Sequence, residues 1–304
     1  MSGLPVVAAV DGSQDSLRAL DWAVDAARRR GAPLRVAHVR QYAAWTQPGV
    51  PVVVPPPPED DPILTDARAH VEARGELPDT EYVGLDGAPG ALLPGLGGEA
   101  QLLVLGSRGR GGFARLLLGS NSITAARDAE CPVVVVPRPG REVDSAPTVE
   151  PGPRVVVGLK VDSPDEATLD LAFTEAALRG ARVQALAAYP WPVQTWSAPG
   201  EVLPQGVDQE ALEHETRTLA DGFLAPLRAR HPGVRAEPYP VPGDAAGHLV
   251  AASKDAELLV IGRHRRRLLA PARMLGSVTH AVLLHAACPV AVVPPTPAEE
   301  RTGT

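Results

Sequence analysis

Three glycines and a serine follow one apolar run with a spacing that suits phosphate binding. The run at 102–105 leads into Gly106–Gly109, and after nine more residues come Gly119 and Ser120, giving the pattern G-x2-G-x9-G-S. Glycines permit positive φ and let the backbone approach a ligand closely. Successive N–H groups and the N-terminus of a following helix both favour anionic oxygens. The pattern predicts a phosphate-binding loop; the alternative is a glycine-rich turn followed by a serine N-cap.

A carboxylate follows the first apolar run of the chain, Val6–Val10. Asp11 and Ser13 stand directly after this run, separated by a glycine. An acidic residue at the end of a strand can accept a hydrogen bond from a ribose hydroxyl. Asp11 or Ser13 can also cap a helix that begins near Gln14. The two interpretations are compatible.

The chain contains an internal duplication. Asp21 parallels Asp170 and Gly31 parallels Gly180, both at an offset of 149 residues, and the offset grows to 157 further along. The parallel segments, each given with its counterpart, are 6–39 with 155–188, 101–110 with 257–266, 117–122 with 274–279, and 130–137 with 287–294. We therefore expect a first domain at 1–138, a linker at 139–153, a second domain at 154–294 and a flexible tail at 295–304.

Within each copy, short apolar runs alternate with stretches of helical periodicity. Leu17, Leu20, Val24 and Ala27 recur at spacings of three or four, and Gly31 is typical of a left-handed helix end. The strands are continuous apolar runs, which indicates that helices cover both faces of a parallel, doubly wound sheet. The candidate strands of the first copy are Val6–Val10, Leu34–Val39, Thr80–Val83, Leu102–Leu105 and Val133–Val136.

These features resemble the universal stress protein family in the tandem form common in actinobacteria. The resemblance rests on V-D-G-S at 10–13, on the glycine pattern at 106–120, and on C-P-V at both Cys131 and Cys288, and it covers nearly the whole chain. It implies an α/β fold of two tandem doubly wound parallel five-stranded sheets with strand order 3-2-1-4-5. The two copies would be related by a pseudo-twofold axis and would associate within the chain through their fifth strands.

The resemblance also implies an ATP site where strands one and four lie side by side, at the topological switch point of the sheet. The glycine-rich backbones would hold the phosphates, Asp11 the ribose, the main chain of Val39 the adenine, and Ala9 would line the floor. Mg²⁺ would be carried on the phosphates. The expected ATP-binding residues are Ala9, Asp11, Val39, Gly106, Ser107, Arg108, Gly109, Gly119, Ser120 and Asn121.

The second copy departs from this pattern at two positions. Lys160 stands where the duplication places Asp11, and Arg265 stands in place of Gly109. A residue with a Cβ strains a turn that needs positive φ, so we expect a degenerate second site. The basic run Arg263–Arg267 is interpreted as a solvated, charged loop; the alternative is that it holds a phosphate or another polyanion.

Composition and charge exclude several classes of protein. A net charge of −7 and a pI near 5.6 argue against a broad nucleic-acid surface. Two cysteines give neither a disulfide framework nor a metal cluster, and we expect both thiols to be buried and inert. No charged-then-apolar signal segment and no membrane-spanning run is visible, so the expected location is cytoplasmic. Asp15, Asp21 and Asp25 are interpreted as a solvated helix face.

The functional hypothesis is a non-catalytic, ATP-binding stress-response protein in which the nucleotide regulates conformation or the choice of a protein partner. One intact site would lie in the first copy, and a homodimer is compatible with this hypothesis. No catalytic residue and no protein-built metal site is assigned. The alternatives are a slow ATPase or nucleotidyl-transfer enzyme on the same fold, and a pure interaction module with two vestigial sites.

Overall fold

A computed structural model describes residues 3–41, 57, 60–75, 77–109, 118–141, 143, 152–191, 208–263 and 275–296. Strands and helices alternate in the first copy, as the apolar runs predict. Ser13 is the N-cap of the first helix, and Gly31 ends it with a left-handed φ of 58°. The elements are β1 (Val6–Val10), α1 (Gln14–Arg30), β2 (Leu34–Arg40), α2 (Pro62–Glu72), β3 (Thr80–Asp86), α3 (Pro89–Gly95), the 3-10 turn η2 (Leu96–Glu99), β4 (Leu102–Gly106), α4 (Ser120–Asp128) and β5 (Val133–Val136).

The second copy repeats this order. Its first helix is capped by Asp165 and ends at Gly180, whose φ of 60° matches that of Gly31. Gly180 is thus the second left-handed helix end that the duplication predicts. The elements are β6 (Arg154–Gly158), α5 (Glu166–Arg179), β7 (Arg182–Tyr189), α6 (Gln209–Arg230), β8 (Ala236–Pro242), α7 (Ala245–Ala252), the 3-10 turn η3 (Ser253–Asp255), β9 (Leu258–Gly262), α8 (Ser277–His285) and β10 (Val290–Val293).

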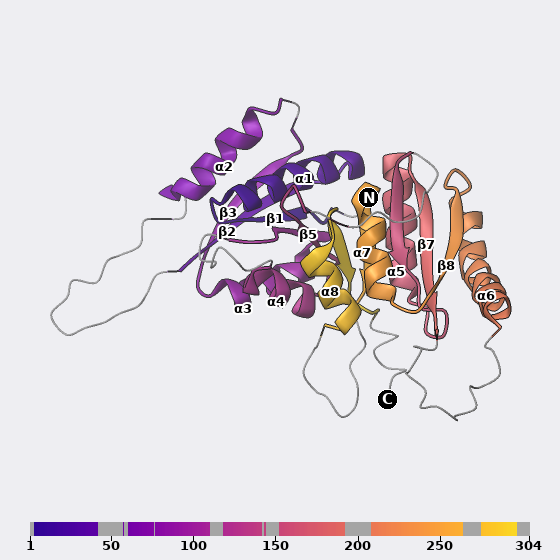
Figure 1. Cartoon of the computed structure of the whole chain (residues 1–304). Helices are drawn as coiled ribbons and strands as arrows, with labels where there is room; N and C mark the ends of the chain where they lie inside the picture. The colour runs from indigo at the N-terminus through magenta and orange to yellow at the C-terminus, as the bar shows by residue number, and fades with distance from the viewer. Residues whose placement is uncertain are drawn as a thin grey trace, which may run out of the picture.

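The strands form one ten-stranded sheet in the order β3-β2-β1-β4-β5-β10-β9-β6-β7-β8 (Figure 1). Each copy therefore has the expected order 3-2-1-4-5, and all pairs inside a copy are parallel. The copies join where β5 and β10 pair antiparallel, with Val134 opposite Ala291. This junction confirms the prediction that the two fifth strands meet, and it merges the two sheets into one.

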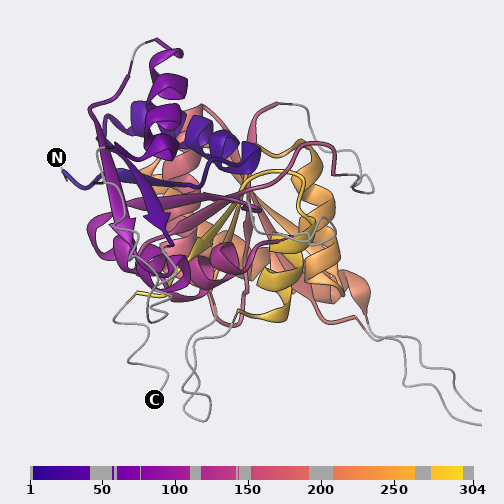
Figure 2. The same cartoon turned by 90° about the vertical axis from the view of Figure 1, so that its left-hand side faces the viewer.

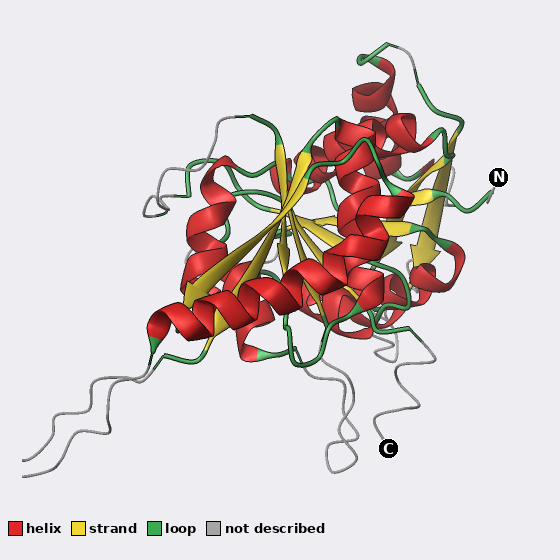
Figure 3. Ribbon diagram, turned by 90° about the vertical axis from the view of Figure 1, so that its right-hand side faces the viewer, coloured by secondary structure: helices red, strands yellow, loops and turns green. Residues whose placement is uncertain are grey.

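Helices cover both faces of the sheet (Figures 2 and 3). One apolar core lies between the sheet and α1, α2, α5 and α6, and the other lies between the sheet and α3, α4, α7 and α8. Both cores run through the two copies without interruption. This arrangement explains the continuous apolar runs of the inner strands such as β4 and β5, whose residues are buried on both faces of the sheet.

A buried group of charges links α1 to α5 across the junction. Glu175 is only 1% exposed and forms ion pairs with both Arg30 and Arg179. The two arginines occupy equivalent positions in the duplicated helices, whereas the position equivalent to Glu175 in the first copy is Ala26. The two repeats are thus complementary at this point and not identical.

The outer edge of β8 has few groups free for strand pairing. Val183 of β7 donates to the carbonyl of Arg235 at 2.8 Å, so every second residue from Arg235 faces β7. The outward carbonyl of Ala236 accepts bonds from Arg228 at 3.1 and 2.8 Å. Three outward positions lack an N–H group because they are prolines: Pro238, Pro240 and Pro242.

Candidate functional site

The candidate site lies at the carboxyl edge of the first repeat, where β1 and β4 are neighbours. These parallel strands pair with Ala8 opposite Val104, so both end at the same edge of the sheet. From this edge α1 passes to one face and α4 to the other. Such a divergence opens a crevice at the switch point of a doubly wound sheet.

The two segments singled out in the sequence meet across this crevice. A Cβ placed on Gly109 would lie 2.4 Å from Oδ2 of Asp11, so the carboxylate contacts the backbone of the glycine-rich loop directly. Asp11 also accepts a hydrogen bond from the N–H of Ser13 at 3.0 Å through its Oδ1. Ser13 in turn accepts a hydrogen bond from the N–H of Ser16. Ser13 is therefore the helix cap, and Asp11 lies against the loop.

A glycine is needed at position 106 because α1 packs closely against it, and not because its φ is positive. A Cβ at Gly106 would lie 2.6 Å from the backbone carbonyl of Asp15 in α1. Neither Gly106 nor Gly109 has a positive φ, which corrects the expectation that these glycines serve a left-handed turn. The first allows α1 to pack against the end of β4, and the second makes room for the Asp11 carboxylate.

The N-terminus of α4 faces the same edge of the sheet. Its N-cap is Gly119, which has no side chain to cap the helix; Ser120 is the first helical residue, which corrects its interpretation as a capping serine. Ser120 and Asn121 are exposed. The first turn therefore offers backbone N–H groups, the positive end of the helix dipole and two polar side chains.

Ser107 and Ser122 fasten this helix end to the sheet. The carbonyl of Ser107 accepts a hydrogen bond from the N–H of Gly119 at 2.8 Å. The buried hydroxyl of Ser122 donates to the carbonyl of Gly106 at 2.8 Å. Ser107 is 1% exposed, and its own hydroxyl has no hydrogen-bond partner among the described residues.

The hydroxyl of Ser122, two residues after Ser120, was expected to be a donor to the phosphates, but it is used to hold α4 to the end of β4. Thr279 takes the same place in the second copy and donates to the carbonyl of Gly262 at 3.3 Å. A hydroxyl is thus retained at this position in both segments that the duplication aligns.

The other expected site residues lie in or just after strands that end at this edge of the sheet. Ala9 and Val39 both pack into the core beneath α3 and α4, and Val39 is 8% exposed near the end of β2. Arg108 is partly exposed in the loop. Burial, followed by repulsion from Arg108, lowers the pKa of the Arg141 guanidinium. Two positive groups therefore lie close enough to interact beside the loop.

The second copy arranges its equivalent edge differently. Lys160 follows β6 with its side chain 64% exposed, and its Nζ lies 3.4 Å from Oδ1 of Asp162. α5 begins later than α1 relative to the preceding strand and is capped by Asp165. A Cβ on Gly262 would meet the side chains of Asp165 and Thr168 at 2.7 and 2.9 Å. An exposed lysine thus replaces the carboxylate at the end of the first strand.

Arg263 corrects the interpretation of the basic run as a solvated loop. It stands where the first copy has Ser107, and it is only 6% exposed. Its Nη1 donates to the carbonyls of Arg127 and Ala129 at 2.7 and 2.8 Å, at the C-terminal end of α4 in the first copy. Arg265 and the rest of that run lie outside the described residues.

Both cysteines are buried, as expected. Cys131 and Cys288 are free thiols, each 5% exposed, just before β5 and β10. Burial raises the pKa of each thiol to about 12. In the described part of the chain, no three His, Cys, Asp or Glu side chains are grouped to hold a metal ion.

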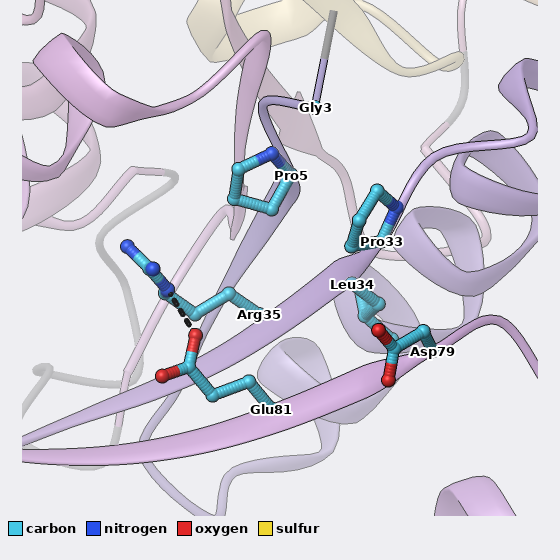
Figure 4. A pocket seen from close by; sticks show the side chains of 7 residues that line it. All are labelled: Gly3, Pro5, Pro33, Leu34, Arg35, Asp79 and Glu81. Atoms are coloured by element: carbon cyan, nitrogen blue, oxygen red, sulfur yellow. Dashed lines mark hydrogen bonds and ion pairs between the residues drawn. The ribbon is translucent and has the colours of Figure 1, made fainter. Parts of the chain in front are cut away.

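A pocket of about 300 Å³ lies at the opposite, amino-terminal edge of the first repeat (Figure 4). Arg35 crosses it and donates to Glu81 at 2.7 Å, so these two charges satisfy each other. None of the expected site residues lines it. The lining residues are Gly3, Pro5, Pro33, Leu34, Arg35, Asp79 and Glu81. The pocket is therefore separate from the crevice at the carboxyl edge.

The fold and the crevice define a tandem, doubly wound α/β protein, and comparison with known proteins gives its family. The profile of the universal stress protein family matches residues 4–137 and 153–294. Universal stress protein Rv2005c of Mycobacterium tuberculosis is 34% identical over 303 residues, covering 94% of this chain and 96% of that protein. Universal stress protein Rv2623 of the same species is 30% identical over 301 residues, with 96% of each chain covered.

A solved structure supports the same fold. The crystal structure of a universal stress protein from Archaeoglobus fulgidus DSM 4304 matches 97% of this chain and 99% of its own, with a TM-score of 0.61 and 16% identity. The chain belongs to the universal stress protein family and carries its domain twice. No helix among the described residues has the length and apolar character to span a membrane.

Proposed function

We propose that the first repeat binds one ATP molecule and that the bound nucleotide regulates the protein's conformation or its choice of partner. The observation that carries this proposal is the contact of the Asp11 carboxylate with Gly109, beside the N-terminus of α4, whose N-cap is Gly119. An acidic group for a ribose hydroxyl and a backbone cradle for phosphates thereby share one crevice.

The charges of the crevice suit a triphosphate. Arg108 lies in the loop and is a cation beside the proposed phosphates. The buried hydroxyl of Ser107 is a further donor at the base of the loop. A divalent ion would be carried on the phosphates, as is usual for ATP.

Binding to the first repeat alone is proposed because the second repeat lacks the matching groups. Lys160 replaces Asp11, and the side chain of Arg263 is bound to α4 of the first repeat. Isothermal titration of the full chain with Mg-ATP should therefore give one site per chain. Two equivalent sites would refute the asymmetry, and the absence of binding would refute the function itself.

We further propose that ATP acts as a bound regulator and is turned over slowly, if at all. Rapid phosphoryl transfer needs a positioned nucleophile and cations that stabilise the developing charge. Among the described residues, Asp11 is the carboxylate that lies against the loop, and we assign it to the ribose and not to a nucleophile. Turnover should lie far below the rate of about 10 s⁻¹ that is typical of enzymes. A rate of that order, lost in Asp11→Ala while ATP binding persists, would favour the slow-ATPase alternative over ours.

A further inference from the structure

α4 is held at its two ends by different repeats. At its N-terminal end, Ser122 bonds to the carbonyl of Gly106 within the first repeat. At its C-terminal end, the guanidinium of Arg263, from the second repeat, bridges the carbonyls of Arg127 and Ala129. Nine residues span only about 14 Å in an α-helix, so the two points of attachment are close.

The bond from Arg263 is strong for its kind. It is a charged donor that satisfies two carbonyls at a helix end, where backbone acceptors otherwise lack partners. Arg263 is 6% exposed, so water competes poorly for these bonds. Its positive charge also lies at the negative end of the helix dipole. The backbone of Arg263 is fixed as well, since its N–H donates to the carbonyl of Val293 at 2.7 Å.

α8 receives a similar bond from a different source. Nη1 of Arg141, a residue that follows β5, lies 3.4 Å from the carbonyl of Leu283 and 2.9 Å from that of Ala286, at the C-terminal end of α8. Arg141 therefore lies outside the glycine-rich loop of the first repeat. Arg263, which binds α4, is the first residue of the equivalent loop in the second repeat.

We infer that Arg263 is a positioning residue for the nucleotide site of the first repeat. By fixing the C-terminal end of α4, it sets the place of the N-terminal end, where the phosphates would bind. This inference rests on the proposed function. It makes ATP affinity in one repeat depend on a residue of the other repeat that does not touch the ligand.

The test compares Arg263→Ser, which copies Ser107 of the first repeat, with Arg263→Lys in the full chain. Affinities for ATP and for adenosine are measured side by side. Arg263→Ser should weaken ATP binding at least fivefold and leave adenosine binding within twofold, because only the phosphates contact α4. Arg263→Lys keeps the charge and several N–H donors on one nitrogen, but its side chain is shorter and lacks the planar guanidinium, so it should give an intermediate loss.

Arg154 provides the matched control. It is a buried arginine of the second repeat, 4% exposed, and donates at 2.8 Å to the carbonyl of Ala252 at the end of α7. Arg154→Ser should leave ATP affinity unchanged even where it lowers the melting temperature. An equal loss of ATP affinity in Arg154→Ser and Arg263→Ser would show general destabilisation and overturn the inference, as would a parallel loss of adenosine binding.

A second measurement does not depend on ATP. Hydrogen exchange at the α4 amides of residues 124–128 should be faster in ligand-free Arg263→Ser than in the wild type, and unchanged in Arg154→Ser. Wild-type exchange and wild-type ATP affinity in a folded Arg263→Ser chain would refute the positioning role. If Arg263→Ser does not fold, Arg263→Lys decides by the same criteria. If the wild type itself binds no ATP, the proposed function fails, and the exchange result still tests the contact.

Discussion

β4 and β9 hold equivalent places in the two repeats, yet the residue that follows each strand differs. In the first repeat it is Ser107, a small buried residue at the base of a loop that meets Asp11. In the second it is Arg263, whose side chain leaves its own repeat and binds the end of α4. The equivalent loop position thus faces its own repeat in one copy and holds a helix of the other repeat in the second.

The two repeats also differ in where the helix after the first strand begins. α1 starts directly after Ser13 and passes close to the end of β4, with its backbone against Gly106. α5 starts later, and side chains of Asp165 and Thr168 occupy the space beside Gly262. In the first repeat the backbone of α1 packs directly on the backbone of Gly106. In the second repeat side chains of α5 and its N-cap lie against Gly262.

The largest expected effect distinguishes these two glycines. Gly106→Ala forces a Cβ to within 2.6 Å of the Asp15 carbonyl, and the helix must shift, which should cost about 3 kcal/mol of unfolding free energy. Gly262→Ala meets the side chains of Asp165 and Thr168, which can shift if the N-cap bond of α5 is given up, so its cost should be about 1 kcal/mol. Urea denaturation of the two full-length variants measures both values. Equal losses would mean that the two repeats do not pack differently here.

The next effect is on ligand affinity. Gly109→Arg, which copies Arg265, places a side chain against the Asp11 carboxylate and should weaken ATP binding more than tenfold, or about 1.4 kcal/mol. Stability should change little, because loop tips contribute little to the core. Gly98→Arg is the control, since the nearest atom to a Cβ there is 3.8 Å away. Unchanged affinity in a folded Gly109→Arg chain would exclude the loop as the phosphate cradle.

A smaller loss is expected at the end of β1. Asp11→Ala removes the proposed bond to the ribose, but it also removes a negative charge from beside the phosphates, so we expect roughly a fivefold weaker affinity. Lys160→Ala, at the equivalent position of the second repeat, should leave ATP affinity unchanged. Titration calorimetry of both variants would contradict the asymmetry if Lys160→Ala were the more damaging change.

The smallest difference between the repeats should be in the reactivity of their cysteine thiols. Burial raises the pKa of both Cys131 and Cys288 to about 12, so both remain protonated thiols at pH 8 and should react slowly in the native protein. A colorimetric thiol reagent should label neither before denaturation and both afterwards. Rapid labelling of one thiol in the native chain would reveal a local opening in that repeat alone.

Local pattern was enough to place the strands and the first helix. Leu34–Val39 and Val133–Val136 were recognisable because buried parallel strands are apolar on both faces, and Gly31 marked a helix end. The order of the strands followed from resemblance to the family and from no local pattern. The contact between Asp11 and Gly109 could be expected for the same reason, once strands one and four were neighbours.

Side-chain contacts between segments far apart in the chain could not be predicted from the sequence. The prediction of a solvated helix face at Asp15, Asp21 and Asp25 is wrong for Asp15, whose side chain is 1% exposed and binds Arg18 and Arg138. Arg138 follows β5, far along the chain, and the helical periodicity of α1 does not indicate that Asp15 contacts it. Arg263 was missed for the same reason, since a basic run in a loop gives no indication that one of its arginines reaches the other repeat.

The prolines along β8 limit how this protein can assemble. A ten-stranded sheet with two receptive edges could add further copies end to end and grow into a filament. Here one edge lacks N–H donors at Pro238, Pro240 and Pro242, and the carbonyl of Ala236 is already bound by Arg228. Edge-to-edge pairing is therefore restricted to the β3 side. Two chains that met there would present only β8 outward, so polymerisation through the sheet would stop at a closed pair.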